Sequence, residues 1–184
     1  MKELVDRLKS KDKVAYEELI DRYNTMVYNT SMGFLGNADE AEDAAQEVFI
    51  TVFEKIHKFE KRAQLKTWIY RITVNVCLQQ LRKRKNKMRS IFTGKAINEP
   101  ADFKHPGLVM EEAEMAKMLY NALLELPDDQ QTAFTLLKLE GLSYEEIGEV
   151  MKKSKSSVES LLHRAKSNLR KLLVGFYDEN MKYG

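Results

Sequence analysis

Two runs of opposite charge stand next to each other in the first half of the chain. The segment 39–60 is acidic, with carboxylates at Asp39, Glu40, Glu42, Asp43, Glu47, Glu54 and Glu60. The segment 61–98 has no acidic residue and carries Lys61, Arg62, Lys66, Arg71, Arg82, Lys83, Arg84, Lys85, Lys87, Arg89 and Lys95. This polarity predicts two different partners, one of them nucleic acid. The alternative is that both runs are solvated helix faces.

A second candidate for DNA binding lies near the C-terminus. The pattern predicts a short helix over 144–151, a polar turn over 152–154 and a longer helix from residue 155, which is the layout of a helix-turn-helix. The side facing the short helix carries Val158, Leu162 and Ala165. The outward side carries Lys155, Ser156, Ser157, Glu159, Ser160, His163 and Arg164. Arginine can pair with guanine, while serine and lysine can hold phosphates or base edges. An ordinary helical hairpin is the alternative.

Enzymatic chemistry is not predicted. The histidines His57, His105 and His163 lie in different segments, and no pair of them has the spacing of metal ligands. His57 and His105 are expected at the surface. There is no phosphate-binding glycine loop and no nucleophile elbow. The single cysteine, Cys77, sits in a mostly apolar helix and is predicted to be a small buried side chain. We expect no catalysis and no metal or other cofactor.

The same features bear on location. No apolar run is long enough to span a bilayer, and the first residues lack the apolar stretch of a signal peptide. A lone cysteine cannot form an internal disulfide, which fits a reducing compartment. We expect a cytoplasmic protein without membrane insertion.

The elements that position these side chains are predicted to be helices. In the first half, Leu4, Leu8, Tyr16, Leu19, Ile20, Tyr23 and Val27 recur at helical spacing. After a break at 33–37, Asn37 or Asp39 is expected to cap a helix with this apolar side: Ala41, Ala44, Ala45, Val48, Phe49, Val52, Phe53 and Ile56. Another helix is expected to begin near Thr67, a candidate N-cap, and to continue into the lysine-arginine run. Between 88 and 110 the periodicity fails, which predicts a linker.

The second half has clear helix boundaries. One apolar stripe is Met115, Leu119, Ala122, Leu123 and Leu126, and the next helix has Ala133, Phe134, Leu136, Leu137 and Leu139. Pro127 is expected at the first position of that next helix, and Gly141 at its left-handed end. Ser143 and Glu146 form a capping box, and Ser154 caps the last helix. The predicted fold class is all-α: two small helical domains joined by a flexible linker, the second domain a helix-turn-helix. The boundaries are 1–90, 91–110 and 111–184.

The amino-acid sequence of three C-terminal segments shows a resemblance to a known family. LP at 126–127, GLSYEEIG at 141–148 and SVESLLHRAK at 157–166 resemble the −35-binding domain of extracytoplasmic-function sigma factors, which belong to the sigma-70 family. The resemblance implies −35 contacts from Lys155, Ser156, Ser157, Ser160, His163 and Arg164. The family often has a basic residue in place of Glu159 and an arginine in place of Leu161. Both departures are expected to remove positive charge from the recognition helix.

The N-terminal segments resemble the same family. DEAEDAAQEVF at 39–49 resembles the segment that docks on the clamp helices of the largest polymerase subunit, which implies core contacts from Asp39, Glu42, Asp43, Gln46 and Glu47. KTWIYRITVN at 66–75 resembles the −10 recognition and melting helix, which implies DNA contacts from Leu65, Lys66, Trp68, Arg71, Asn75 and Arg82. For Trp68, core packing is an equal alternative, and Tyr70 either stacks on a base or anchors the fold. Gln79 replaces an aspartate that many members carry.

The resemblance implies a sigma factor that binds core RNA polymerase, recognises the −10 and −35 elements and melts promoter DNA. It also implies an anti-sigma factor as a further partner. The alternative is a stand-alone helix-turn-helix regulator, which would bind duplex DNA without polymerase and usually as a dimer.

Overall fold

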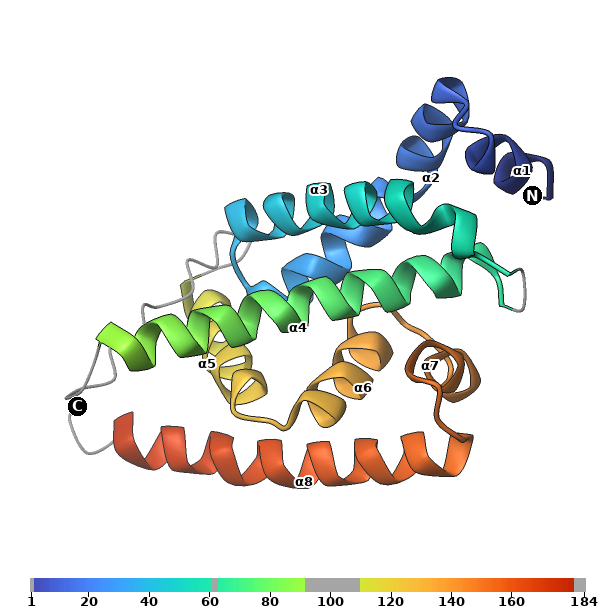
Figure 1. Cartoon of the computed structure of the whole chain (residues 1–184). Helices are drawn as coiled ribbons and strands as arrows, with labels where there is room; N and C mark the ends of the chain where they lie inside the picture. Colours follow the sequence, from blue (N-terminus) through green and yellow to red (C-terminus); the bar gives the residue numbers. More distant parts are fainter. Residues whose placement is uncertain (1, 61–62, 92–109, 181–184) are drawn as a thin grey trace.

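Helices account for all the regular structure in the part of the chain that a computed structural model describes, residues 2–60, 63–91 and 110–180 (Figure 1). The N-terminal domain comprises α1 (Lys2–Lys9), α2 (Lys13–Leu35), α3 (Ala38–Lys55), the 3-10 turn η1 (Ile56–Lys58) and α4 (Leu65–Ile91). The C-terminal domain comprises α5 (Met110–Leu124), α6 (Asp128–Lys138), α7 (Tyr144–Met151) and α8 (Lys155–Asn180). The predicted all-α, two-domain class is confirmed. Most of the predicted linker, 91–110, lies outside the described residues.

The boundary between α2 and α3 is set by two adjacent residues. Gly36 ends α2 in the left-handed conformation, with a φ of 64°. Asn37 follows in extended conformation, and its side-chain oxygen accepts a hydrogen bond from the Glu40 N–H at 2.9 Å. Asn37 is therefore the cap of α3, and Asp39 lies in the first turn, where its charge complements the helix dipole.

The predicted start of α4 near Thr67 is confirmed, but the prediction of Thr67 as its N-cap is wrong. The helix begins at Leu65, and the Trp68 N–H already bonds to the Gln64 carbonyl oxygen at 3.1 Å. Thr67 is nearly buried, and its hydroxyl donates to the Glu149 carboxylate at 3.4 Å instead of capping its own helix. α4 is also longer than predicted, because it continues through the lysine-arginine run to Ile91.

The N-terminal domain has its core between α2, α3 and α4, which pack against one another. Its fully buried large side chains include Phe34, Leu19, Leu35, Val27, Val48, Val52 and Ile69. Two residues predicted on apolar sides are exposed, Ile20 at 39% and Phe53 at 49%. Phe53 packs its ring against Tyr16 at a centroid distance of 4.6 Å, at the edge of the core. Helical periodicity alone does not separate such an edge position from an interior one.

The C-terminal domain follows the predicted boundary signals closely. Both halves of the capping box between Ser143 and Glu146 are present at the start of α7. Gly141 has a φ of 65°, as predicted, and Lys152 ends α7 with a φ of 55°. Ser154 caps α8, since its hydroxyl accepts a hydrogen bond from the Ser157 N–H at 3.2 Å. Pro127 stands one position before α6, not at its first position.

The packing of α5 on α8 involves fewer apolar residues than predicted. The buried cluster consists of Ala122, Leu123, Leu126, Ala165 and Leu169. Met115 is 61% exposed, Leu119 36% and Leu139 56%, so these three predictions of inward positions are wrong. Met115 and Leu119 precede the part of α5 that packs on α8, which begins at Ala122.

The two domains pack against each other, which the sequence did not indicate. α4 contacts α7, and α2 contacts α6. One continuous hydrophobic core extends from Leu65 and Ile69 in the N-terminal domain to Leu142 and Ile147 in the C-terminal domain. In Figure 1, α4 runs between α3 on one side and the C-terminal helices on the other.

Candidate functional site

The predicted DNA face at the C-terminus is the exposed side of the first turns of α8. Lys155, Ser156, Ser157, Glu159, Ser160, His163 and Arg164 are all exposed. Val158, Leu162 and Ala165 on the opposite side are buried. The orientation of the helix predicted from the pattern is therefore confirmed.

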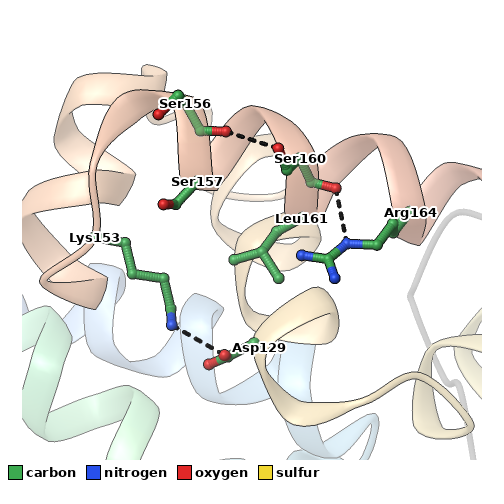
Figure 2. A pocket seen from close by; sticks show the side chains of 7 residues that line it. All are labelled: Asp129, Lys153, Ser156, Ser157, Ser160, Leu161 and Arg164. Carbon is green, nitrogen blue, oxygen red and sulfur yellow. Dashed lines mark hydrogen bonds and ion pairs between the residues drawn. The ribbon is translucent and has the colours of Figure 1, made fainter.

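A polar hollow lies beside this face, between α8 and the start of α6 (Figure 2). It is lined by Asp129, Lys153, Ser156, Ser157, Ser160, Leu161 and Arg164. The Lys153 ammonium pairs with the Asp129 carboxylate at 3.0 Å across the hollow, and the Arg164 Nε donates to the Ser160 carbonyl oxygen at 3.2 Å. Hydroxyl groups, the exposed Arg164 guanidinium and the Lys153–Asp129 ion pair thus border an open polar site.

The two departures from the family pattern lie in different environments. Leu161 is only 7% exposed and belongs to the hydrophobic core, whereas Glu159 is exposed on the outward side. Leu161 leaves the recognition helix without a charge at this position, and its side chain packs inward at the edge of the polar hollow. Of these two departures, Glu159 is the one that changes the charge that DNA would meet.

The side chains predicted for the −10 element lie in three different environments. Lys66 and Asn75 are exposed on α4, and the Lys66 ammonium is 5.7 Å from the Tyr70 ring centroid. Leu65 is 3% exposed and packs in the core. Trp68 is half-buried and packs against Phe59, at a ring-centroid distance of 5.3 Å. In this structure Trp68 is therefore a packing residue, which was one of the two alternatives predicted for it.

The two predicted −10 arginines contact the C-terminal domain. The Arg71 Nε donates to the carbonyl oxygens of Glu149 and Val150, at 3.1 and 3.3 Å. Arg82 pairs with the Asp128 carboxylate at 2.6 Å. Both arginines come from α4, and their partners lie at the end of α7 and the start of α6.

Tyr70 also joins the domains. It is 3% exposed, and its hydroxyl donates to the Glu140 carboxylate at 3.0 Å. Burial raises the pKa of Glu140, although the hydrogen bonds from Tyr70 and Thr30 and the charge of Lys66 oppose this. Burial raises the pKa of the Tyr70 hydroxyl as well. In this arrangement Tyr70 is an anchor between helices and is not available to stack on a base.

The predicted polymerase face is an open stripe on α3. Asp39, Glu42, Asp43 and Gln46 are exposed, and Glu47 is partly exposed and accepts a hydrogen bond from the Gln80 amide at 3.1 Å. Two apolar side chains, Ile50 at 60% and Phe53 at 49% exposure, extend the stripe toward the end of the helix. Sequence spacing could have assigned Ile50 and Phe53 to this stripe, since positions 39, 43, 46, 50 and 53 lie on one helical face.

The described residues contain neither a metal-binding cluster nor a membrane-spanning helix. They contain no group of three or more potential metal ligands among His, Cys, Asp and Glu. No helix in the described ranges is sufficiently long and apolar to cross a bilayer. Cys77 is buried as predicted, and burial raises the pKa of its thiol to about 12, so a reactive thiolate is disfavoured.

The protein families that match the chain correspond to the two domains. A model described as Sigma-70 region 2 matches residues 19–87, and one described as Sigma-70, region 4 matches residues 116–169. The chain is 31% identical over 180 residues to the RNA polymerase sigma-H factor of Pseudomonas aeruginosa, covering 93% of this chain and 92% of that protein. It is 29% identical over 180 residues to the ECF RNA polymerase sigma factor SigW of Bacillus subtilis, covering 94% and 96%.

Two solved structures share the fold. One is CnrH in complex with the cytosolic domain of CnrY, with a TM-score of 0.65 and 18% identity over 94% of this chain and 96% of that chain. The other is the sigma factor RpoE in complex with the anti-sigma factor NepR from Bartonella quintana, with a TM-score of 0.60 and 24% identity over 86% and 96%.

With both regions in this order and a relative above 30% identity over nearly the whole chain, the protein is a sigma-70 family sigma factor. It is also 32% identical over 170 residues to the ECF RNA polymerase sigma-E factor of Haemophilus influenzae, covering 89% of each chain, so within that family it belongs to the extracytoplasmic-function (ECF) group. It therefore directs RNA polymerase to promoters, and the alternative of a stand-alone regulator is not favoured. The family is not a class of enzymes.

Proposed function

We propose that this sigma factor divides promoter-directed initiation among three surfaces: the stripe on α3, the exposed side of α4 and the outward side of α8. The observation that carries the proposal is that each surface has exposed side chains of the chemistry its partner requires. We assign residues 1–90 to polymerase docking and the −10 element, 91–110 to the linker and 111–184 to the −35 element.

The α3 stripe is the proposed contact with core polymerase. Its carboxylates at Asp39, Glu42, Asp43 and Glu47 can pair with basic residues on the clamp helices of the largest subunit, and the Gln46 amide can add a hydrogen bond. Ile50 and Phe53 add apolar area beside these charges, as polar-rimmed protein interfaces usually do.

The exposed side of α4 is the proposed −10 surface. Lys66 and Arg82 are exposed and would hold backbone phosphates, as would the half-buried Arg71, which bonds to α7 in the free chain. The exposed Asn75 amide would hydrogen-bond a base of the opened strand. Opening a base pair costs stacking energy, which such contacts offset. Leu65 and Trp68 would support the base pocket through the packing of the segment before α4.

The outward side of α8 is the proposed −35 surface. Ser156, Ser157 and Ser160 with Lys155 and His163 would position the helix on phosphates, and Arg164 would contact a base edge in the major groove. The N-terminus of α8 adds a favourable dipole for phosphate.

Three further properties belong to the same proposal. The chain itself contributes no catalysis, which is left to the polymerase, and it acts in the cytoplasm. An anti-sigma factor controls it, as the complex of the relative from Bartonella quintana suggests. Such a partner would mask the polymerase and promoter surfaces.

A gel shift on promoter DNA with and without core polymerase tests the proposal. We expect specific binding only in the presence of core, whereas a stand-alone regulator would bind alone and overturn it. Permanganate footprinting tests the −10 assignment: Asn75→Ala should lose reactivity on duplex promoter and regain transcription on a pre-melted template. Asn24→Ala, an exposed asparagine on α2, is the matched control. An equal loss by Asn75→Ala on both templates would contradict the assignment of Asn75.

A further inference from the structure

The first helix, α1, packs against η1, the turn that leads into the segment before α4. Its apolar side chains Leu4, Val5 and Leu8 are buried in the hydrophobic core. It contacts α2 as well as η1. The Sigma-70 region 2 model matches the chain only from residue 19, so α1 lies outside the matched part of the domain. Its position beside η1 makes α1 a support for the chain that continues toward α4.

Lys9, the last residue of α1, reaches the chain that follows η1. Its ammonium donates a hydrogen bond to the Phe59 carbonyl oxygen at 2.8 Å. A charged donor makes a stronger bond of this kind than a neutral one. The N–H of Phe59 bonds to the Ile56 carbonyl oxygen at 3.0 Å, where η1 ends. Both polar backbone groups of Phe59 are therefore held, one by η1 and one by α1.

Trp68 of α4 holds the same stretch of chain. Its ring packs against the Phe59 ring at a centroid distance of 5.3 Å, and its N–H bonds to the Gln64 carbonyl oxygen at 3.1 Å. Phe59 is only 5% exposed. The pocket segment, by which we mean residues 59–60 and 63–64 before α4, is thus fixed at both ends. Lys9 and Trp68 hold its first residue, and Trp68 also holds its last.

The end of α1 that carries Lys9 is tied to α2. The Arg7 guanidinium bonds to the Asp12 carboxylate at 2.7 Å and to the Glu18 carboxylate at 3.3 Å. Asp12 is also the N-cap of α2, where its side chain accepts a hydrogen bond from the Val14 N–H at 2.9 Å. The hydrogen bond from Arg7 lowers the pKa of Asp12, so this carboxylate stays charged. Lys9 therefore extends from a helix end whose position is set by α2.

The placement of Phe59 bears on the proposed −10 surface, because the pocket segment leads into Leu65 and Lys66 at the start of α4. A pocket that is already in place when a base arrives saves the free energy of ordering its backbone. We propose that Lys9 is a positioning residue for the −10 base pocket, which acts through the Phe59 carbonyl oxygen without touching DNA. This inference rests on the proposed role of α4 and of the segment before it.

The alternative role for the Lys9 ammonium is a direct contact with a DNA phosphate, and the two roles differ in salt dependence. Loss of one phosphate contact with single-stranded DNA lowers the slope of log K against log salt by about 0.7. Loss of a positioning contact weakens capture of the base and leaves this slope unchanged. The salt slope and the dependence of binding on the captured base therefore separate the two roles.

The test compares holoenzymes by fluorescence anisotropy on a promoter with a pre-opened −10 element, either intact or with an abasic site at each −10 position in turn. Lys9→Met removes the donor and keeps the aliphatic stem, whereas Lys9→Arg keeps a donor. Lys13→Met is the matched control, an exposed lysine at the first position of α2.

We expect Lys9→Met to bind the intact template about three- to tenfold more weakly, as the loss of one hydrogen bond predicts, with an unchanged salt slope. At the position whose base is captured, the weakening caused by the abasic site should shrink by the same factor. Lys9→Arg and Lys13→Met should bind as the wild type does. Lys9→Gln takes the place of Lys9→Met if the latter does not keep the helical circular dichroism of the wild type.

Three results would overturn the positioning role of Lys9. They are unchanged binding by folded Lys9→Met, a loss that lowers the salt slope while the abasic profile stays as in wild type, and an equal loss in Lys9→Arg or Lys13→Met. Failure of the proposed function has a different signature. In that case the wild-type holoenzyme would show no −10 position at which an abasic site weakens binding, whichever residue stands at position 9.

Discussion

The Lys155 ammonium at the first position of α8 lies 2.6 Å from the Glu145 carboxylate in the first turn of α7. The hydrogen bond raises the pKa of Lys155 and lowers the pKa of Glu145, so both groups are held in their charged forms. The helix-turn-helix therefore ties one of its proposed phosphate-binding cations to its own supporting helix. DNA bound at this face would have to compete with Glu145 for this cation.

Replacing Glu145 with Gln should release Lys155 for DNA. We expect the holoenzyme to bind −35 DNA about two- to fivefold more tightly, a modest change because the pair is exposed. A double-mutant cycle with Lys155→Gln, measured by anisotropy on −35 duplex, provides the control. If Glu145→Gln tightens binding equally when residue 155 is glutamine, then the effect does not pass through Lys155.

Reversing two charges on the α3 stripe should weaken docking to core polymerase. Asp43→Lys with Glu47→Lys places two like charges against the basic partner, and each close pair across an interface can couple by about 1.5 kcal/mol or more. Glu17→Lys with Asp21→Lys is the matched control, an exposed pair at the same spacing on α2. A pull-down with core polymerase is the measurement. Undiminished binding of core polymerase by the folded α3 variant would show that the stripe is not part of the interface.

The contact between Tyr70 and Glu140 should make closure of the two domains depend on pH. Burial raises the pKa of Glu140 above its ordinary value of 4.5, against the opposing effects of Tyr70, Thr30 and Lys66. Closing therefore takes up a proton, so the closed form gains stability as pH falls through the raised pKa. Below the ordinary pKa of Glu140, the stability of the closed form no longer increases as the pH falls. Above the raised pKa, the closed form bears the full free-energy cost of the buried negative charge.

Scattering on the free chain at about pH 5 and pH 7.5 tests this dependence. We expect a smaller radius of gyration at the lower pH for wild type. The difference should vanish in Glu140→Gln, which mimics the protonated group, and persist in Glu125→Gln, an exposed control. If the radius of gyration of Glu140→Gln still depends on pH, then another group causes the dependence.

The local structure followed from the sequence wherever one residue type is strongly preferred. Gly141, the Ser143–Glu146 capping box and Ser154 are each determined by interactions within a few residues, and all lie as predicted. Thr67 shows the limit, because its hydroxyl bonds to Glu149, 82 residues away, and not to its own helix. A tertiary contact of this kind has no local signature.

Which face of a helix is buried was harder to predict. Phe53 and Leu139 satisfy the apolar period of their helices yet are exposed, since periodicity marks apolar positions and not what covers them. The contact of Arg71 with α7 could not be predicted either. A basic residue on a helix that resembles a DNA-binding element has the same sequence signature whether it faces DNA or a carbonyl oxygen.

Glu159 on the outward side of α8 should limit nonspecific attraction to DNA. Glu159→Lys should strengthen binding to many −35 sequences alike and steepen the salt dependence by about one phosphate equivalent. Glu159→Gln, which only removes the negative charge, should strengthen binding with little change in the salt slope. The measurement is a salt titration of holoenzyme binding to promoter DNA. An unchanged slope for Glu159→Lys would mean that position 159 faces away from the phosphates.

Arg164 should determine base preference at one −35 position. In the free chain its Nε bonds to the Ser160 carbonyl oxygen, and the side chain is exposed on the edge of the polar hollow. If it pairs with a guanine, Arg164→Ala costs roughly 1–3 kcal/mol and relaxes the preference at one position. Arg170→Ala, an exposed arginine further along α8, should leave the preference unchanged. Selection from a promoter library with the holoenzyme separates base readout from phosphate contact: a phosphate contact weakens all sequences alike. A profile of Arg164→Ala that matches wild type at every −35 position would show that this arginine does not read a base.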